Sequence, residues 1–264
     1  MRVCRSIAEI RDALTPLRSG TVGLVPTMGA LHAGHLALLE AARTECELVV
    51  MSLFVNPAQF GDEGDLDRYP RDEARDLQLA DEAGVGVVFA PTAEEMYPPG
   101  FQTWVEVTEL GSILEGRFRP GHFRGVATVV LKLLLAVRPT RVYFGRKDAQ
   151  QVEVVRRMTR DLAVDVEVRA VPTVRDADGL ALSSRNVLLS PEERASALAF
   201  PRALATKDAT RAHELLAEDG LLVDYVEVAD FDPPVLAGAV RVGSTRLIDN
   251  VPLEDNVPLE GEER

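Results

Sequence analysis

Two histidines near the start of the chain have the types and spacing to bind an anion. His32 and His35 close the stretch 25–35, Val-Pro-Thr-Met-Gly-Ala-Leu-His-Ala-Gly-His, which follows an apolar run and precedes an amphipathic segment. The stretch is therefore expected where a first strand turns into a first helix. α/β folds bind phosphates at that point, because the free N–H groups of a helix N-terminus attract negative charge. An isolated pair of this kind would be read as two surface histidines on a loop.

The elements that must position this turn alternate between strands and helices. Apolar runs bounded by turn residues predict five strands, and segments with helical spacing lie between them. This alternation predicts βαβ units and a parallel sheet covered by helices on both faces. The predicted strands are residues 21–25, 48–54, 85–90, 141–144 and 164–171, and the predicted helices are residues 36–44, 71–83, 126–137 and 150–162.

Polar loops follow two further strands of the predicted sheet. Asn56 and Gln59 come after the second strand, and the run 145–151, Gly-Arg-Lys-Asp-Ala-Gln-Gln, comes after the fourth. Because the carboxyl ends of parallel strands lie at one edge of a sheet, these loops and the histidine turn are expected to share a crevice. The amides could hold a hydroxyl or a carboxylate without adding charge. Taken alone, Lys147 and Asp148 fit a solvated helix cap equally well.

The pattern changes beyond Pro172, and we place a domain boundary there, giving units 1–173 and 174–264. Ser183, Ser184 and Arg185 offer two hydroxyls and a guanidinium group, which suit phosphate oxygens, although a lone Ser-Ser-Arg would be read as a solvated loop. The second unit is predicted to be a small α+β appendage with helices at 194–205 and 209–217 and strands at 222–228 and 241–248. Its end, where Asn-Val-Pro-Leu-Glu occurs at 250–254 and again at 256–260, is expected to be frayed.

Composition narrows the classes of partner. The 264 residues are 46% hydrophobic and carry a net charge of −13, which argues against nucleic acid as the main partner. A small anion is still compatible, because Arg117, Arg119, His122 and Arg124 cluster in the sequence. The N-terminus lacks the apolar core of a signal peptide, and the longest apolar run, 126–137, is too short to span a membrane. We therefore expect a cytoplasmic protein with reduced cysteines.

Read together, these segments resemble the pantothenate synthetase family, ligases that join pantoate to β-alanine using ATP. The resemblance covers nearly all of residues 1–190 in order. It implies a Rossmann-like, doubly wound nucleotidyl-transferase domain, a smaller α+β C-terminal domain acting as a lid, and a homodimer. The motifs that carry the resemblance are residues 26–35, 53–71, 121–134, 143–151, 174–186 and 246–250.

The resemblance also implies a two-step reaction and a role for individual residues. The carboxylate of (R)-pantoate attacks the α-phosphate of ATP to give pantoyl adenylate and pyrophosphate, and the amine of β-alanine then displaces AMP. The implied catalytic residues are His32, His35, Lys147 and Arg185. The implied ATP contacts are Met28, His32, His35, Gly145, Lys147, Asp148, Val174, Ser183, Ser184 and Arg185, the implied pantoate contacts are Pro26, Met28, Val55, Gln59 and Gln151, and Asp76 is the implied contact of Mg²⁺.

Three departures from the family pattern bear on the site. Arg146 replaces a usual glutamate, Arg75 stands beside Asp76 where relatives often have an acid, and the stretch between Glu193 and Val242 is shorter than usual. Two other functions fit part of the pattern. A related nucleotidyl-transferase that adenylates a phosphate ester would leave Gln59 and Gln151 unexplained, and a non-catalytic nucleotide sensor would explain the departures. A nicotinamide-dependent oxidoreductase is excluded, because no G-x-G-x-x-G follows the first strand.

Overall fold

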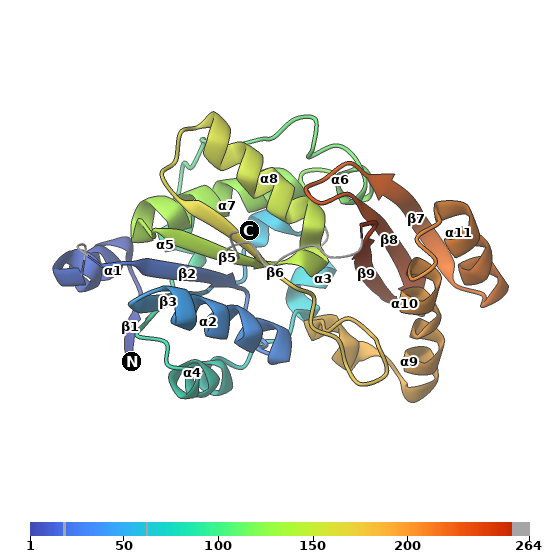
Figure 1. Ribbon diagram of the computed structural model, residues 1–264. Coiled ribbons are helices and arrows are strands. Elements are labelled where there is room, and N and C mark those ends of the chain that lie inside the picture. Colours follow the sequence, from blue (N-terminus) through green and yellow to red (C-terminus); the bar gives the residue numbers. More distant parts are fainter. Residues whose placement is uncertain (18–19, 62, 255–264) are drawn as a thin grey trace.

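Two β-sheets organise the computed structural model, which describes residues 1–17, 20–61 and 63–254. The first sheet has six parallel strands in the order β1-β4-β3-β2-β5-β6 (Figure 1). Its strands are β1 (Arg2–Cys4), β2 (Val22–Thr27), β3 (Leu48–Leu53), β4 (Val87–Phe89), β5 (Arg141–Gly145) and β6 (Glu167–Val171). The five strands predicted from apolar runs are all present, and β1 was not predicted.

The strand order reverses between β2 and β5. From β2 the chain winds outward through β3 to β4, and it then returns to the other side of β2 to form β5 and β6. This is the doubly wound parallel arrangement expected from the sequence. Ligands of such sheets bind at the carboxyl ends of the strands where the winding changes direction. The stretch with the two histidines and the run 145–151 follow these two strands, so they face the switch point together.

Helices cover both faces of the large sheet, which explains why its central strands β2 and β3 are mostly apolar. Along β2, Leu24 packs into the core under α1, α7 and α8, whereas the next residue, Val25, packs against α2 and α4. Both residues are fully buried. The helices of this part are α1 (Ile7–Leu14), η1 (Thr15–Leu17), α2 (Ala33–Glu45), η2 (Pro57–Gln59), α3 (Glu63–Arg68), α4 (Glu73–Glu82), α5 (Ala93–Met96), α6 (Glu115–Phe118), α7 (His122–Val137), η3 (Arg146–Asp148) and α8 (Ala149–Asp161).

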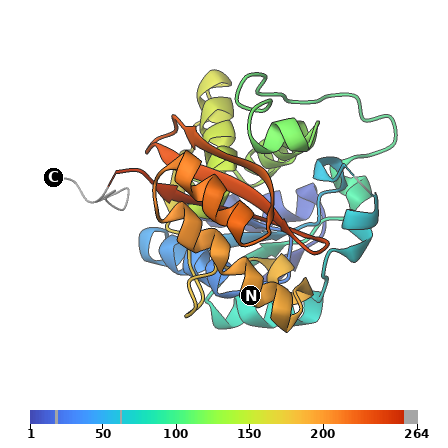
Figure 2. The same cartoon turned by 90° about the vertical axis from the view of Figure 1, so that its right-hand side faces the viewer.

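A three-stranded antiparallel sheet in the order β7-β8-β9 forms the C-terminal part with its own helices, and it lies beside one end of the large sheet (Figures 1 and 2). The elements are η4 (Ser184–Leu188), α9 (Pro191–Ala197), α10 (Ala199–Leu204), α11 (Ala209–Glu218), β7 (Leu222–Ala229), β8 (Val235–Val242) and β9 (Thr245–Pro252). They share a separate hydrophobic core. The predicted boundary after residue 173 stays a prediction, and it falls just beyond the end of β6.

Two expectations for the C-terminal part were wrong. The segment 241–248, predicted as one strand, contains the turn between β8 and β9, because Gly243 has a φ of 56° that reverses the chain there. Residues 250–252, expected in a frayed end, belong to β9, where Ala237 pairs with Asn250 and Val235 pairs with Pro252. The second copy of the repeat, 256–260, lies outside the described residues.

Candidate active site

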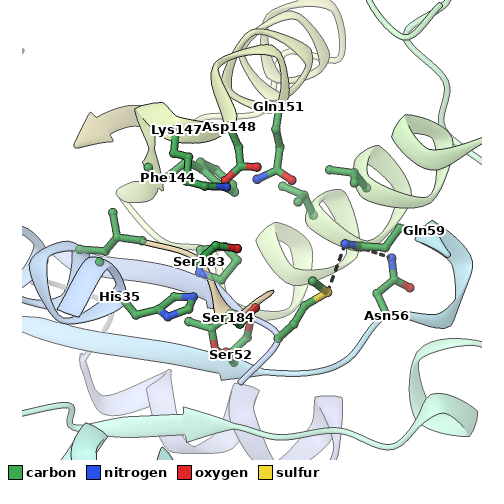
Figure 3. Close-up of a pocket in the computed structure, with 18 of the residues that line it drawn as sticks. His35, Ser52, Asn56, Gln59, Phe144, Lys147, Asp148, Gln151, Ser183 and Ser184 are labelled. Atoms are coloured by element: carbon green, nitrogen blue, oxygen red, sulfur yellow. Dashed lines mark hydrogen bonds between the residues drawn. The ribbon is translucent and has the colours of Figure 1, made fainter. Parts of the chain in front are cut away.

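A pocket lies where β2, β3 and β5 end, at the switch point of the sheet (Figure 3). Its inner cavity has a volume of about 230 Å³, and an adjoining cleft of about 760 Å³ reaches the C-terminal sheet. All but two of the residues implied by the family resemblance line the inner cavity. These are Pro26, Met28, His32, His35, Gln59, Gly145, Lys147, Asp148, Gln151, Val174, Ser183, Ser184 and Arg185.

The two histidines cap the N-terminus of α2. The backbone N–H of Gly34 donates to Nδ1 of His32 at 3.1 Å, and the backbone N–H of His32 donates to Nδ1 of His35 at 3.3 Å. A nitrogen that accepts a hydrogen bond carries no proton, so in each neutral ring the proton lies on Nε2. The motif therefore orients two imidazole rings, 4.1 Å apart between centroids, and gives each one an Nε2–H donor.

Both histidines are neutral at physiological pH. Burial, helped by the nearby His32 and Lys147, lowers the pKa of His35 to about 3. Burial and Lys147 also lower the pKa of His32 below its ordinary value. The sequence predicted that the two histidines could bind an anion, and in the structure they can do so as neutral hydrogen-bond donors. Positive charge in the pocket comes instead from the side chains of Lys147, Arg185 and Arg119.

The amide of Gln59 is held in one orientation at the other end of the pocket. Its Oε1 accepts a hydrogen bond from Nδ2 of Asn56 at 2.9 Å, and its Nε2 contacts Sδ of Met28 at 3.2 Å (Figure 3). Asn56 is itself fixed, because the hydroxyl of Tyr97 donates to its Oδ1 at 2.8 Å. Asn56 also lines the pocket, and although its amide was noticed in the sequence, it was not assigned to the site.

Helix α7 approaches this amide closely. A Cβ atom at Gly125 would lie 2.2 Å from the carbonyl oxygen of Ala58 and 2.7 Å from the backbone nitrogen of Gln59, so only glycine fits. The close approach lets three valines of α7 form an apolar wall beside the amides. They are Val126, Val129 and Val130.

Val55 does not line this pocket, in contrast to the expectation. Its neighbours Phe54 and Asn56 do, and both are buried, whereas Val55 is only partly buried. Successive side chains of an extended segment point to opposite sides, so Phe54 and Asn56 share one side and Val55 takes the other. The apolar wall predicted from Val55 is supplied by Phe54 and by α7.

The side chains suited to bind phosphate come from two further loops. Lys147 and Asp148 lie on η3, and Ser183 and Ser184 lie at the start of η4 on the opposite side of the pocket (Figure 3). Oγ of Ser183 accepts the backbone N–H of Arg185 at 3.3 Å, which fixes the turn. The hydroxyl of Tyr69 lies 3.3 Å from Oγ of Ser184. Tyr69 was not predicted as a site residue, and its place in the matched segment 53–71 was the only signal.

Arg119 and His122 add a second basic group beside Gln59. Nδ1 of His122 donates to the backbone carbonyl of Gln59 at 2.8 Å, and a guanidinium nitrogen of Arg119 lies 3.4 Å from Nε2 of the same ring. Burial and the adjacent Arg119 lower the pKa of His122 to about 4, so the ring is neutral. Both residues line the pocket. The sequence showed them only as part of a basic cluster.

Asp76 does not fit the role of a magnesium ligand. Its two carboxylate oxygens accept the backbone N–H groups of Ala30 at 2.9 Å and Leu31 at 2.8 Å, and its side chain is 2% exposed. Ala30 has a φ of 51°, which is disfavoured for a residue with a Cβ atom, so the carboxylate stabilises a turn that the backbone disfavours. Asp76 therefore supports the loop that carries His32 and His35.

The two arginine departures lie outside this pocket. The side chain of Arg146 points into a separate cavity, and its Nε is buried with no hydrogen-bond partner among the described residues. Arg75 lies in the first turn of α4, where its backbone N–H donates to the N-capping Asp72. Neither arginine alters the lining of the pocket.

Comparison with known proteins agrees with this geometry. The family model described as pantoate-beta-alanine ligase matches residues 2–252. A pantothenate synthetase of Pelotomaculum thermopropionicum is 48% identical over 279 aligned residues, covering 96% of this chain and 99% of the relative. That alignment is longer than the 264-residue chain, as expected if this chain is shorter than its relatives.

Solved structures give the same result. The pantothenate synthetase of Thermus thermophilus is 49% identical, with a TM-score of 0.92 and coverage of 97% of this chain and 100% of that one. The pantoate-beta-alanine ligase of Francisella tularensis, solved in complex with beta-gamma ATP and beta-alanine, is 34% identical, with a TM-score of 0.88 and coverage of 97% and 99%. This chain, with its doubly wound sheet and its pocket of paired histidines and amides, belongs to the pantoate-beta-alanine ligase family.

Proposed function

We propose that this protein condenses (R)-pantoate with β-alanine to form pantothenate, using ATP and releasing AMP and pyrophosphate. The observation that carries the proposal is that one cavity joins two kinds of group. Neutral amides and the donors and cations suited to phosphates line the same space: Gln59 lies across the cavity from His35, and Gln151 lies beside Lys147 and Asp148. An enzyme that activates a carboxylate with ATP must hold the carboxylate oxygen next to the α-phosphorus, so it needs both kinds of group around one cavity.

In the first step, a carboxylate oxygen of pantoate attacks the α-phosphorus of ATP. The bond from that phosphorus to the bridging oxygen breaks, and pyrophosphate leaves with the electron pair. The amides of Gln59 and Gln151 hold pantoate by its hydroxyl and carboxylate oxygens without a tight ion pair, so the carboxylate keeps its nucleophilicity. Pro26, Met28 and the valines of α7 supply the apolar wall for the methyl groups of pantoate.

Negative charge moves toward the leaving pyrophosphate during this step. Hydrogen-bond donors and cations that line the pocket can stabilise this charge. The Nε2–H groups of His32 and His35 donate to phosphate oxygens, and Lys147 and Arg185 supply positive charge. Ser183 and Ser184 donate from the opposite loop, while Gly145, Asp148 and Val174 contact the nucleoside. Donors that are already oriented need no rearrangement as charge develops, which is how such sites lower a barrier.

In the second step, the amine of β-alanine attacks the acyl carbon of pantoyl adenylate, the acyl carbon–oxygen bond breaks, and AMP leaves. The proton that the amine loses as the amide forms passes to solvent. We assign the carboxylate of β-alanine to Arg119, which lies beside Gln59 and so beside the acyl group. His122 is neutral and donates a hydrogen bond to the backbone carbonyl of Gln59, so Arg119 is the residue of this pair that supplies positive charge to the carboxylate of β-alanine.

Three further properties belong to this proposal. Mg²⁺ accompanies ATP, and we assign no residue to it: Asp76 does not fit, and no group of three or more His, Cys, Asp and Glu among the described residues could hold a metal ion. We infer a homodimer from the family resemblance, which implies one. We place the protein in the cytoplasm, where ATP is available. No helix in the described parts of the chain is long and apolar enough to cross a membrane.

The test uses purified protein with ATP, Mg²⁺, (R)-pantoate and β-alanine. AMP and pyrophosphate are expected in equal amounts, and omission of β-alanine should leave a bound adenylate and pantoate-dependent exchange of labelled pyrophosphate into ATP. Exchange that required a phosphate ester and ignored pantoate would identify a different adenylating enzyme. ATP binding without AMP formation would identify a nucleotide sensor. A particle mass of twice 28.8 kDa would support the homodimer.

A further inference from the structure

Strand β9 belongs to the C-terminal sheet, and its residues line the cleft that adjoins the active-site pocket. It is an edge strand of the three-stranded sheet, and it pairs only with β8 among the described residues. Because side chains alternate along a strand, Arg246, Ile248 and Asn250 share one side. Ile248 packs in a cluster with Leu114 and Ala149, which lie beside α6 and at the start of α8. This side of β9 therefore faces the part of the chain that carries Lys147.

Asn250 holds the backbone of the turn on which Lys147 lies. Its Nδ2 donates to the carbonyl oxygen of Arg146 at 2.8 Å and to that of Lys147 at 2.9 Å. The two carbonyls belong to η3, and Asn250 is 7% exposed. A single buried amide thus uses both of its N–H donors on this turn, and its loss would leave two carbonyl oxygens without this partner.

Arg246 anchors the other end of the same strand. Its guanidinium group donates to the two carboxylate oxygens of Glu115 at 2.6 and 2.7 Å and to Oδ2 of Asp224 at 2.6 Å. The hydroxyl of Tyr225 donates to Glu115 at 3.0 Å. Burial alone would raise the pKa of Glu115, but the hydrogen bonds and charge of Arg246 outweigh it and hold that pKa below its ordinary value. The pair is therefore a charged contact across the two parts of the molecule.

Glu115 is in turn connected to the segment that carries Gln151, whose side-chain amide is assigned to pantoate. The backbone N–H of Glu115 donates to Oε1 of Gln150 at 3.0 Å, and Nε2 of Gln150 donates to the carbonyls of Leu110 and Ile113 at 2.7 and 2.8 Å. Gln150 directly precedes Gln151 and is 5% exposed. Strand β9 is thus attached to both ends of residues 146–151.

The opposite side of β9 contacts the segment that leads from Val174 to Ser183. Asp249 accepts two hydrogen bonds from the guanidinium group of Arg175, at 2.6 and 3.0 Å. Arg175 follows Val174 in the segment that leads to Ser183, and Asp249 is 3% exposed. One strand of the C-terminal part therefore binds both loops that supply phosphate contacts.

We propose that β9 is the element through which the C-terminal part positions the catalytic lysine, with Asn250 setting the Arg146–Asp148 turn and the Arg246–Glu115 pair anchoring the strand. Asn250, Arg246 and Glu115 are positioning residues in this proposal, which rests on the proposed adenylation reaction. Their effect on the rate should then be transmitted by Lys147 and should vanish when the lysine is absent.

The test compares Asn250→Ala with the wild type and then repeats the comparison in a Lys147→Ala background. We measure pantoate-dependent pyrophosphate exchange in the full-length protein. Asn250→Ala should lower kcat by about tenfold and leave the KM for pantoate within about twofold, and in the Lys147→Ala background it should lower kcat by less than about twofold, because residues that act as a unit are not additive. A tenfold loss in both backgrounds, or an unchanged kcat in the first, would overturn the proposal.

Arg246→Lys and Arg241→Lys form a matched pair for the anchor. Both arginines contact Asp224, but only Arg246 contacts Glu115, and Arg241 is 50% exposed. Lysine keeps the charge and loses the two-pronged contact, so Arg246→Lys should lower kcat by about threefold or more and Arg241→Lys should not. Equal effects of the two variants would overturn the role of the anchor.

Hydrogen exchange provides a readout that does not depend on activity. Backbone amides of residues 146–151 should exchange faster in Asn250→Ala than in the wild type and should be unchanged in Arg241→Lys. If Asn250→Ala does not fold, Asn250→Ser, which keeps one hydroxyl donor, undergoes the same measurements. An inactive wild type would refute the proposed reaction, whereas an active wild type whose segment 146–151 ignores these changes would refute only the role of β9.

Discussion

The side-chain amide of Asn56 donates a hydrogen bond to Oε1 of Gln59 at 2.9 Å. Because the oxygen of Gln59 is engaged in this way and its nitrogen faces Met28, the amide cannot flip without losing both contacts. The same asparagine accepts from Tyr97 and donates to the carbonyl of Gly125. Asn56 therefore decides which end of the Gln59 amide a bound substrate meets.

Replacing Asn56 by alanine should weaken pantoate recognition. Gln59 would lose its fixed orientation, so we expect the KM for pantoate to rise by about tenfold, the scale of one to two hydrogen bonds, while the KM for ATP changes little. Steady-state kinetics with each substrate varied in turn would measure this. Gln78→Ala removes an exposed amide that donates to Glu82 within α4, and it should leave both values unchanged. A change in the KM for ATP alone would contradict the assignment of Asn56 to the pantoate end.

Loss of a phosphate donor should lower the rate of adenylation and not merely the affinity. His35→Ala removes a neutral donor fixed at the N-terminus of α2, and Lys147→Ala removes a positive charge, so each should reduce pyrophosphate exchange by about a hundredfold or more. Quenched-flow measurement of adenylate formation would separate this step from the later aminolysis. His213→Ala, which changes an exposed histidine of α11, is the control. Near-normal rates in both site variants would mean that other residues hold the phosphates.

Much of this site could be predicted because α/β folds place function just after apolar strands, where short motifs are conspicuous. His32, Gln59 and Lys147 were all found in this way. The role of Asp76 could not be predicted, because its partners, Ala30 and Leu31, lie more than forty positions earlier in the chain and no local pattern signals the contact. The hairpin of β8 and β9 was missed for a different reason. Val235–Val242 has Ala-Gly-Ala at its centre, and these residues have low strand propensity, so the run did not stand out as a strand.

Stability should decrease as the pH falls, because two half-buried histidines resist protonation. The pKa of His35 is about 3 and that of His122 about 4 in the folded protein, against an ordinary value of 6.5. Below about pH 6.5 the unfolded chain binds these protons and the folded chain does not, so the free energy of unfolding should fall by up to about 1.4 kcal/mol per pH unit for each histidine down to about pH 4. Above pH 7 these groups should have no effect.

Urea titrations at pH 7, 6 and 5 would check this dependence. In His122→Gln the slope of the unfolding free energy against pH should be shallower than in the wild type by up to about 1.4 kcal/mol per unit, since one of the two groups is gone. His213→Gln, at an exposed position, should keep the slope of the wild type. Parallel curves for the wild type and His122→Gln would contradict the low pKa of the His122 ring.

Asp76 provides a test that separates support of the histidine loop from metal binding. Asp76→Ala leaves the N–H groups of Ala30 and Leu31 without their acceptors, so we expect the protein to lose about 1–3 kcal/mol of unfolding free energy for each unsatisfied group. Asp76→Asn keeps one acceptor oxygen and should lose less. Because the loop carries His32 and His35, kcat should fall in the same order.

The dependence on Mg²⁺ separates this role from metal binding. The Mg²⁺ concentration that gives half of the maximal rate should stay the same in both variants, since the carboxylate of Asp76 accepts backbone N–H groups. A variant of wild-type stability that required about tenfold more Mg²⁺ would instead make Asp76 a metal ligand and would leave the strained backbone at Ala30 without its explanation.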